Sequence, residues 1–508
     1  MILLLQMYDS FQRSTFIPKY SSDMVDKYIY KKISEHFPYE PTEEQQKAIA
    51  AIAAFAADTT PRSLLILRGY AGTGKTSVLG AVVKALHAME RPSVLLAPTG
   101  RAAKVFAEYA ERDAFTIHKK IYRQKSFSND FGSFSLGKNL QKNTLFIVDE
   151  ASMISNESAG QNAFGSGHLL DDLIEYIYED GQGCRLILSG DSAQLPPVML
   201  RESPALSAER LRAYGMEVHE VSLTQVVRQD VDSGILFNAT RIRNGLRQSE
   251  TTRFPVLRVE GFPDIQKVTG EDLIEEIASA YSRDGVDDTI VVCRSNKRAA
   301  RYNNGIRQYI LGREEEIERG DRLMVVKNNY HRWSQAKDAE SSFIANGEIV
   351  EVLRVRRVTE LYGFHFTDVL VRFQDDAAEV ELRVLTETLR NESPTLPRED
   401  SDRLFYAVLE DYKEVKTKAT RMKKMKEDPY FNAVQAKYAY AITCHKAQGG
   451  QWRNVFLDIG YLTEEMLGED FYRWLYTAVT RATGRLYFVN LPPAFEEGGG
   501  RGKEAEDF

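Results

Sequence analysis

Apolar runs alternate with amphipathic segments along most of the chain, and this alternation predicts parallel strands separated by helices. Residues 63–67 form a short apolar run, and residues 77–87 carry apolar side chains at helical spacing. Further apolar runs follow at 145–148 and 185–188. Runs of this length are typical of strands that are buried on both faces of a sheet. The pattern predicts an α/β fold with doubly wound parallel sheets.

The second half of the chain repeats the apolar runs but interrupts them with a different pattern. The runs that predict a second parallel sheet are residues 289–293, 438–442, 455–458 and 485–489. Residues 321–388 instead alternate apolar and polar side chains, in the stretches 323–326, 348–355, 364–373 and 380–385. Alternation with a period of two is typical of antiparallel strands. We therefore expect a small antiparallel barrel inserted into the second α/β domain.

A chain of 508 residues is too long for one hydrophobic core, and its length suggests roughly three or four domains. We expect an N-terminal extension at 1–40 and a tail without regular structure at 496–508. The predicted domains are a first α/β domain at 41–222 with an insertion at about 119–142, a second α/β domain in two parts at 223–320 and 431–495, and between those parts the β domain with a charged helical segment at 321–430.

The segment GYAGTGKT, from Gly69 to Thr76, matches the phosphate-binding pattern G-x-x-x-x-G-K-[ST] between a predicted strand and a predicted helix. Glycines let the backbone approach a phosphate, and the N–H groups at the helix start point toward an anion. Lys75 supplies a positive charge for the β and γ phosphates, and Thr76 offers a hydroxyl to Mg²⁺. This segment predicts a site for a nucleoside triphosphate, with ATP and Mg²⁺ as the expected cofactors.

Two acidic residues, Asp149 and Glu150, end the apolar run at 145–148. The first can hold Mg²⁺, and the second can orient and deprotonate an attacking water. We expect Asp149 to be a metal ligand together with Thr76, and Glu150 to be the catalytic base.

With DEASM at 149–153 and GDSAQLPPV at 190–198, the sequence resembles the superfamily 1 helicases, specifically the RecD and Dda branch, superfamily 1B. The resemblance implies two RecA-like motor domains, a β-hairpin pin and an SH3-like barrel. It continues in order through the segments 97–104, 116–118, 223–229, 438–449 and 475–482, which look like motifs Ia, Ib, IV, V and VI of that family.

The resemblance also implies roles for individual residues. Gln194 would sense the γ phosphate, and Arg228 and Arg481 would reach that phosphate from the second motor domain. The nucleotide contacts expected from the P-loop and from motif V are Gly69, Ala71, Gly72, Thr73, Gly74, Lys75, Thr76, Ser77, Gln448 and Gly449. The nucleic-acid contacts expected are Pro98, Thr99, Arg101, His118, Phe131, Asn346, Thr443, His445 and Lys446.

Gln45 has two interpretations that remain open together. The family places an adenine-binding glutamine ahead of the P-loop, and Gln45 lies at that point of the chain. Thr42 and Gln45 also have the spacing of a capping box, which predicts a helix that begins there and runs to about residue 58.

Motifs Ia and III contain Pro98-Thr99 and Leu195-Pro196-Pro197 instead of base-stacking aromatic residues. By resemblance, this predicts movement from 5′ to 3′ on single-stranded DNA. Residues 127–134 suit a tight turn between two short strands, at the place where relatives carry the pin. The phenylalanines there could stack on the last base pair, as proposed for Phe131, or pack the hairpin onto its domain, and the sequence favours neither alternative.

The net charge of −7 argues against a broadly basic surface, so DNA would bind in a focused groove. Lysines gather between residues 403 and 426, but interspersed acidic residues favour a solvated helix over a nucleic-acid arm. The three cysteines lack metal-ligand spacing, which predicts buried reduced thiols. We find neither a signal peptide nor a membrane span in the sequence, which makes the cytoplasm the expected compartment.

The motifs together predict an ATP-dependent DNA helicase that serves DNA repair, recombination or replication. Its expected partners are single-stranded DNA, junctions of single and double strands, and a single-strand-binding, replication or repair protein; we expect a monomer and no membrane partner. An RNA-directed motor and a nucleotide-gated scaffold that binds without unwinding are the alternatives.

Overall fold

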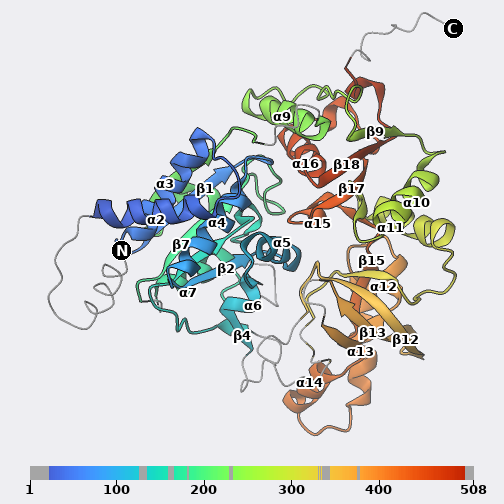
Figure 1. Ribbon diagram of the computed structural model, residues 1–508. Helices are drawn as coiled ribbons and strands as arrows, with labels where there is room; N and C mark the ends of the chain where they lie inside the picture. Colours follow the sequence, from blue (N-terminus) through green and yellow to red (C-terminus); the bar gives the residue numbers. More distant parts are fainter. Residues whose placement is uncertain are drawn as a thin grey trace, which may run out of the picture.

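The computed structural model describes residues 22–124, 134–157, 165–179, 182–227, 233–329, 331, 333, 344–374 and 378–497. Two α/β units lie beside each other, and a β-barrel lies below the second one (Figure 1). Each α/β unit is a parallel sheet with helices packed on it. The expected fold class is therefore confirmed, including the closed barrel and a two-stranded antiparallel hairpin.

The first sheet has the strand order β3-β2-β6-β7-β1-β8. Its strands are β1 (Ser63–Gly69), β2 (Ser93–Ala97), β3 (Ala114–Thr116), β6 (Leu145–Val148), β7 (Arg185–Gly190) and β8 (Glu217–Leu223). Neighbouring residues of one strand belong to different cores: Leu64 and Ile66 pack in one cluster, and Leu65 and Leu67 in another. The sheet is therefore buried on both faces, as the continuous apolar runs predict.

Helices cover both faces of this first sheet. One face packs against α2 (Ser22–His36), α3 (Glu43–Ala57), α4 (Lys75–Ala88) and α5 (Gly100–Ala110). The other packs against α6 (Ile117–Ile121), α7 (Leu169–Tyr178) and α8 (Ala208–Ala213). β1 lies between β7 and the edge strand β8, and its carboxyl end opens at the edge of the sheet where α/β proteins bind ligands.

A short hairpin extends from the first unit at the position expected for the pin. Strands β4 (Tyr122–Gln124) and β5 (Phe134–Leu136) pair antiparallel, with Gln124 opposite Phe134. Phe134 is buried in the core of the first unit, so this phenylalanine packs the hairpin onto its domain. Phe131 and the rest of the turn lie outside the described residues.

The second sheet has the strand order β16-β10-β17-β18-β9. Its strands are β9 (Ile265–Val268), β10 (Thr289–Cys293), β16 (Ala441–Thr443), β17 (Trp452–Asp458) and β18 (Ala482–Val489). One core of the sheet holds α9 (Gly234–Arg247) and α16 (Glu469–Val479). The opposite core holds α10 (Leu273–Asp284) and α11 (Asn296–Gly305), and it continues into the barrel.

The barrel closes in the order β11-β12-β13-β14-β15. Its strands are β11 (Arg322–Val325), β12 (Ile349–Leu361), β13 (Phe364–Phe373), β14 (Glu379–Leu385) and β15 (Val434–Tyr438). The expectation of one strand at 438–442 is wrong. Residues 434–438 close the barrel instead, and β16 of the second sheet begins three residues later. The Asn303 side chain accepts from the Tyr440 and Ala441 N–H groups and thereby pairs the backbone between the two strands.

The charged segment beside the barrel forms two helices, α13 (Arg398–Asp411) and α14 (Lys418–Glu427). Met425 on α14 and Leu404 and Val408 on α13 pack with Phe364 and Phe366 of the barrel. Lys416, Lys418 and Lys424 are exposed, as expected for a solvated helical surface.

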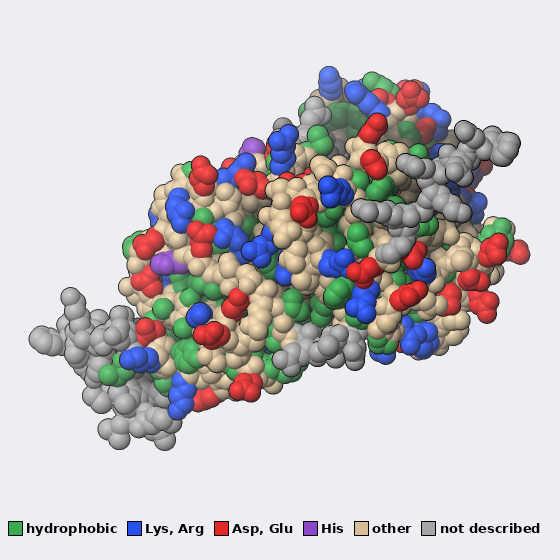
Figure 2. All heavy atoms as spheres, turned by 90° about the horizontal axis from the view of Figure 1, so that it is seen from above, with side chains coloured by type: hydrophobic (Ala, Val, Ile, Leu, Met, Phe, Trp, Pro, Cys, Tyr) green, Lys and Arg blue, Asp and Glu red, His purple; other side chains and the backbone are tan. Residues whose placement is uncertain are grey.

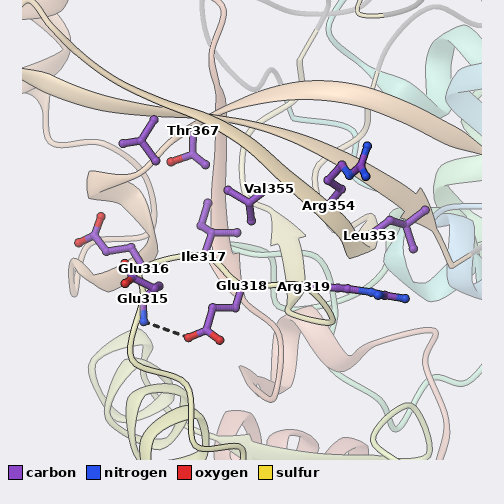
Figure 3. Close-up of a pocket in the computed structure, with 10 residues that line it drawn as sticks. Glu315, Glu316, Ile317, Glu318, Arg319, Leu353, Arg354, Val355 and Thr367 are labelled. Atoms are coloured by element: carbon purple, nitrogen blue, oxygen red, sulfur yellow. Dashed lines mark hydrogen bonds between the residues drawn. The ribbon is translucent and has the colours of Figure 1, made fainter.

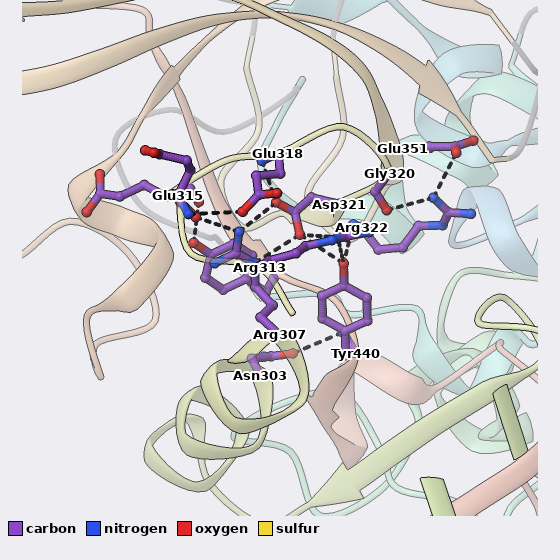
Figure 4. Close-up of polar contacts among 12 residues, drawn as sticks. Asn303, Arg307, Arg313, Glu315, Glu318, Gly320, Asp321, Arg322, Glu351 and Tyr440 are labelled. Carbon is purple, nitrogen blue, oxygen red and sulfur yellow. Dashed lines mark hydrogen bonds and ion pairs between the residues drawn. The ribbon is translucent and has the colours of Figure 1, made fainter. Parts of the chain in front are cut away.

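A buried acidic residue, Asp321, ties the barrel to the second α/β unit (Figure 4). Its carboxylate accepts from Arg307 Nε at 2.9 Å, from Arg307 Nη2 at 3.0 Å and from the Tyr440 hydroxyl at 2.9 Å. Arg313 pairs with the same carboxylate. Asp321 precedes β11, whereas Arg307 belongs to the π-helical turn η3 (Ile306–Ile310) after α11. This network therefore fixes the orientation of the barrel on the second unit.

An open hollow of about 570 Å³ lies at the same junction (Figure 3). It is lined by the loop 315–319 and by Leu353, Arg354 and Val355 of β12. Its walls are mixed in charge, and none of its lining residues belongs to the P-loop or to the acidic pair after β6.

The surface seen from above shows basic and acidic side chains interspersed (Figure 2). This face therefore has no continuous basic coat. Cys184, Cys293 and Cys444 are free, and all three are buried, as the sequence predicts. Within the described ranges, we find no helix with the length and hydropathy that crossing a membrane requires.

We predict that Asp321→Ala destabilises the protein by about 3–5 kcal/mol, because it leaves the buried guanidinium of Arg307 and the partly buried guanidinium of Arg313 without their carboxylate. Urea unfolding of both proteins measures the difference. The control is Glu392→Gln, which removes an ion pair with Lys297 of α11 whose side chains are 56% and 55% exposed. This control should cost less than about 1 kcal/mol. If the two substitutions lower the free energy of unfolding equally, the Asp321 network does not have this stabilising role.

Candidate nucleotide site and nucleic-acid interface

The P-loop connects the carboxyl end of β1 to the first residue of α4. Gly72 and Gly74 have φ angles of 77° and 83°, in the left-handed region that favours glycine. A Cβ on Gly69 would lie 2.6 Å from Lys75 Cγ, so the lysine side chain folds back over the loop. Lys75 Nζ donates to the Tyr70 carbonyl at 3.0 Å. This geometry forms the anion cradle that the sequence predicts, with the lysine ammonium beside it.

Gln45 contacts the P-loop and is only 1% exposed. Its side-chain oxygen accepts from the Thr42 N–H at 3.0 Å, and its N–H donates to the Thr42 hydroxyl oxygen at 3.3 Å. The predicted capping box of α3 is therefore confirmed. The side-chain nitrogen of Gln45, Nε2, donates to the Thr73 carbonyl at 3.1 Å. In this arrangement Gln45 braces the loop, and its adenine contact stays a prediction.

Asp149 follows β6 and faces the start of α4. Thr76 Oγ1 donates to Asp149 Oδ2 at 3.3 Å, and Ser189 Oγ donates to Asp149 Oδ1 at 2.8 Å. Hydroxyl and carboxylate oxygens in this combination suit Mg²⁺, which binds few protein ligands and keeps water and phosphate oxygens. No group of three or more His, Cys, Asp and Glu side chains with metal-site geometry occurs among the described residues. The Thr76–Asp149 pair thus fits a Mg²⁺ that arrives with a nucleotide.

Glu150 adopts a left-handed backbone conformation with a φ of 54° immediately after β6. Burial raises the pKa of its carboxyl, and the nearby Asp149 raises it further, whereas Arg481 and Lys75 lower it. Burial is the largest of these effects, so the pKa lies above the ordinary value of 4.5. A carboxylate with a raised pKa is better suited to accept a proton from water.

Arg481 brings a positive charge from the second unit toward this site and is 2% exposed. Its guanidinium donates to the Thr477 carbonyl at 3.0 Å, to the Gly450 carbonyl at 3.0 Å and to the Thr480 hydroxyl at 3.2 Å. Its charge lowers the pKa of Glu150, so it lies within electrostatic reach of the predicted base. Arg228, the other predicted arginine, lies outside the described residues.

The loop after β7 carries Gln194 into the boundary between the two units. Gln194 is 4% exposed, and its side-chain oxygen has no hydrogen-bond partner among the described residues. On the next residue, the Leu195 N–H donates to Thr477 Oγ1 at 2.8 Å, and the Leu195 carbonyl accepts from Gln448 Nε2 at 2.7 Å. The predicted motif V residue Gln448 therefore contacts the loop of motif III.

Sequence reasoning missed several residues that join the two units. The Tyr476 hydroxyl accepts from the Ala71 N–H at 2.9 Å and donates to Asp191 Oδ2 at 2.7 Å. The Arg243 guanidinium lies 4.2 Å from the centre of the Tyr70 ring. A signal for Thr477 was present, because it lies in the same predicted motif VI as Arg481, which follows the end of α16. For Tyr476, the only signal in the sequence was its place within motif VI.

The predicted nucleic-acid residues of motif Ia meet motif V. Thr99 caps α5 by accepting from the Ala102 N–H at 3.2 Å. A Cβ on Gly449 would lie 3.0 Å from Thr99 Oγ1, so the two segments touch. Arg101 donates to the Gln451 carbonyl at 2.9 Å and stacks 3.9 Å above the Trp452 ring. Pro98, just before this contact, is partly exposed.

The loop of the barrel also reaches motif V, because Lys446 donates to the Asn346 side-chain oxygen. Burial lowers the pKa of Lys446 to about 8, so loss of its charge begins near neutral pH. His445 is exposed, and Thr443 is partly buried at the end of β16. Thr443, His445 and Lys446 belong to the second unit, and Asn346 belongs to the barrel loop that Lys446 contacts.

His118 sits in the first unit, where its ring centre is 5.6 Å from that of Tyr122. Burial lowers its pKa to about 4, partly offset by Asp172, so its ring is neutral at physiological pH. A neutral imidazole can donate one hydrogen bond to a phosphate but supplies no charge. The roles of His118 and of the other predicted site residues stay predictions.

Comparisons with known proteins agree with this geometry. Residues 40–255 match the family model described as an AAA domain, and residues 438–489 match the UvrD-like helicase C-terminal domain. The chain is 24% identical to the uncharacterized protein R530 of Acanthamoeba polyphaga mimivirus, over 84% of this chain and 95% of that protein. It is 23% identical to the ATP-dependent RecD2 DNA helicase of Deinococcus radiodurans, over 87% of this chain and 49% of that protein. The chain thus spans about half the length of RecD2.

Among solved structures, the Pif1 helicase from Bacteroides in complex with ADP-AlF3 and ssDNA is similar with a TM-score of 0.45 and 17% sequence identity. That match covers 90% of this chain and 95% of the Pif1 chain.

An N-terminal P-loop domain followed by a helicase C-terminal domain defines a P-loop NTPase with two motor domains. The chain belongs to the P-loop helicases of superfamily 1B, so the family expected from the motifs is confirmed. We call the two α/β units the first and second motor domains below.

We predict that Glu150→Gln lowers the kcat of ATP hydrolysis by about 10²–10⁴-fold, because general-base catalysis contributes a factor of this size. Steady-state phosphate release measures kcat, and binding of a fluorescent ATP analogue checks that the site remains intact. If the variant binds the analogue tightly and hydrolyses ATP at a near-normal rate, Glu150 is not the catalytic base.

We predict that the kcat of the unsubstituted protein falls on the acid side with an apparent pKa above 4.5, because burial raises the pKa of Glu150. The base works only when it is deprotonated, so activity is present above this pKa and is lost as the pH falls through it. A pH profile of kcat at saturating ATP measures the acid limb. The residual activity of Glu150→Gln should lack that limb; an unchanged limb in this variant would assign the titration to another group.

Proposed function

We propose that this chain is an ATP-dependent DNA helicase that moves 5′ to 3′ on single-stranded DNA and separates the duplex ahead of it. The observation that carries the proposal is the shared boundary between the nucleotide site and the second motor domain. The first domain supplies the P-loop, Asp149 and Glu150, whereas the second supplies Arg481 and Gln448. Hydrolysis at such a boundary changes how the two domains fit together, and a polymer held by both domains would move.

The chain's own residues divide the chemistry between them. The P-loop N–H groups and Lys75 hold the phosphates, and Glu150 takes a proton from the attacking water. Thr76 and Asp149 would hold Mg²⁺, which supplies charge neutralisation between the phosphates when it is bound. Arg481 sits within electrostatic reach of Glu150, where its guanidinium can stabilise negative charge as the γ phosphate leaves.

The DNA track would run along the line where motif Ia, motif V and the barrel meet. The Thr99–Gly449 contact joins the two motor domains along this line, and the Lys446–Asn346 bond joins the barrel to it. Contacts of this polar and backbone kind position a strand without reading its sequence. We therefore propose little sequence preference, with single strands and strand junctions as the partners.

The absence of aromatic side chains from residues 98–99 and 195–197 supports the 5′-to-3′ direction. The similarity to the ATP-dependent RecD2 DNA helicase of Deinococcus radiodurans supports DNA as the track. A role in DNA repair, recombination or replication follows as part of the same proposal.

We predict that the protein unwinds a duplex with a 5′ single-stranded tail and leaves the same duplex with a 3′ tail intact. A fluorescence strand-displacement assay compares the two substrates with ATP and Mg²⁺, and a substrate with an RNA tail of the same sequence tests the sugar. Glu150→Gln is the matched control, because it keeps the binding surfaces and should not unwind either substrate.

Unwinding only from the 3′ tail would contradict the direction. Stronger stimulation and unwinding on the RNA tail would favour the RNA-directed motor. Steady ATP turnover without displacement of any strand would favour the binding scaffold.

A further inference from the structure

Tyr476 lies where three segments meet, and it is 1% exposed. It belongs to α16 of the second motor domain, whereas both partners of its hydroxyl belong to the first. One partner is the Ala71 N–H of the P-loop, and the other is Asp191 Oδ2 after β7. A single phenolic oxygen therefore joins the nucleotide loop to the loop that carries Gln194.

The next residue on α16 holds the same loop from a second point. Thr477 Oγ1 accepts from the Leu195 N–H and donates to the Arg473 carbonyl at 2.7 Å. Asp191 Oδ1 accepts from the Ala193 N–H at 2.9 Å. The backbone on both sides of Gln194 is therefore positioned by groups that α16 contacts directly.

The segment that bears the predicted DNA residues is in turn packed on α16. Cys444 lies between Thr443 and His445, and its thiol donates to the Trp474 carbonyl at 3.5 Å. A shift of this segment would move α16 with it, because separating buried polar groups from their partners costs free energy. The route from DNA to nucleotide then passes through α16.

We propose that Tyr476 is a positioning residue that couples DNA binding to hydrolysis: its hydroxyl aligns the P-loop with the Gln194 loop when the second motor domain closes. This inference rests on the proposed function, because it assumes that a single strand bound by both motors stimulates turnover. Tyr476 touches neither nucleotide nor DNA in this account and acts through Ala71 and Asp191.

Tyr476→Phe tests the proposal, because it removes one oxygen and retains the ring. The control is Tyr472→Phe on the same helix, whose hydroxyl donates to the Arg253 carbonyl at 2.9 Å within the second motor domain. The readout is the ratio of kcat with saturating single-stranded DNA to kcat without it. We expect about a tenfold fall of this ratio in Tyr476→Phe and a change of less than about twofold in Tyr472→Phe, with equal DNA dissociation constants.

A second variant, Thr477→Val, removes the acceptor of the Leu195 N–H without changing the size of the side chain, and it should lower the ratio in the same direction. It keeps the test available if Tyr476→Phe does not fold. A fall of both rates by the same factor in Tyr476→Phe, or equal ratios in the two tyrosine variants, would overturn the inference. Absence of stimulation by DNA and by RNA in the unsubstituted protein would overturn the proposed function as well.

Discussion

Polar groups that are buried at the boundary of two domains must find partners there, and this constraint shapes the whole nucleotide site. The Leu195 N–H and carbonyl, the Ala71 N–H and the Asp191 carboxylate all lie in the first motor domain but bond to side chains of the second. Each bond has a modest net free energy, whereas a buried donor or acceptor left without a partner is costly. The two domains therefore favour one relative position. A ligand that changes this position alters the hydrogen bonds of both domains.

The charges of the site follow the same logic. Glu150 lies among two acidic neighbours, Asp149 and Asp191, and two basic groups, and only one of these basic groups, Lys75, belongs to its own domain. The other, Arg481, is held by carbonyls and a hydroxyl of the second domain and comes close only while the domains are in contact. Because Arg481 lowers the pKa of Glu150 from the second domain, a change in the distance between the domains would change the pKa of the predicted base.

Much of the fold could be predicted from the sequence because the central strands are continuous apolar runs. The run at 289–293 coincides with β10, and the P-loop was marked by residue types that its backbone requires. β9 was missed because it is an edge strand whose two central residues are exposed and polar. The run at 438–442 reads as one apolar strand, but it spans the end of β15 and the start of β16, and Asn303 pairs the backbone between these strands.

The residues of the P-loop and of the acidic pair after β6 could be predicted from the sequence, whereas contacts between distant segments of the site were harder to predict. Lys75 and Thr76 begin a helix after the P-loop, and Asp149 and Glu150 directly follow a strand, so the sequence pattern indicates their positions. The bracing of Thr73 by Gln45 and the bridge made by Tyr476 depend on tertiary contacts 28 and 405 residues apart in sequence. A tyrosine in an amphipathic helix is usually a core residue, so its hydroxyl could be assigned only once its neighbours were known.

The central claim, that nucleotide binding closes the boundary between the motor domains, is tested most directly by a distance between them. The three native cysteines are buried, so spin labels can be placed selectively at the exposed positions Glu90 and Glu275 after substitution to cysteine. Double electron–electron resonance then measures the distance without nucleotide, with a nonhydrolysable ATP analogue and single-stranded DNA, and with ADP. The account predicts a shorter and narrower distance distribution with the analogue and DNA than in the other two states. The same distribution in all three states would contradict it.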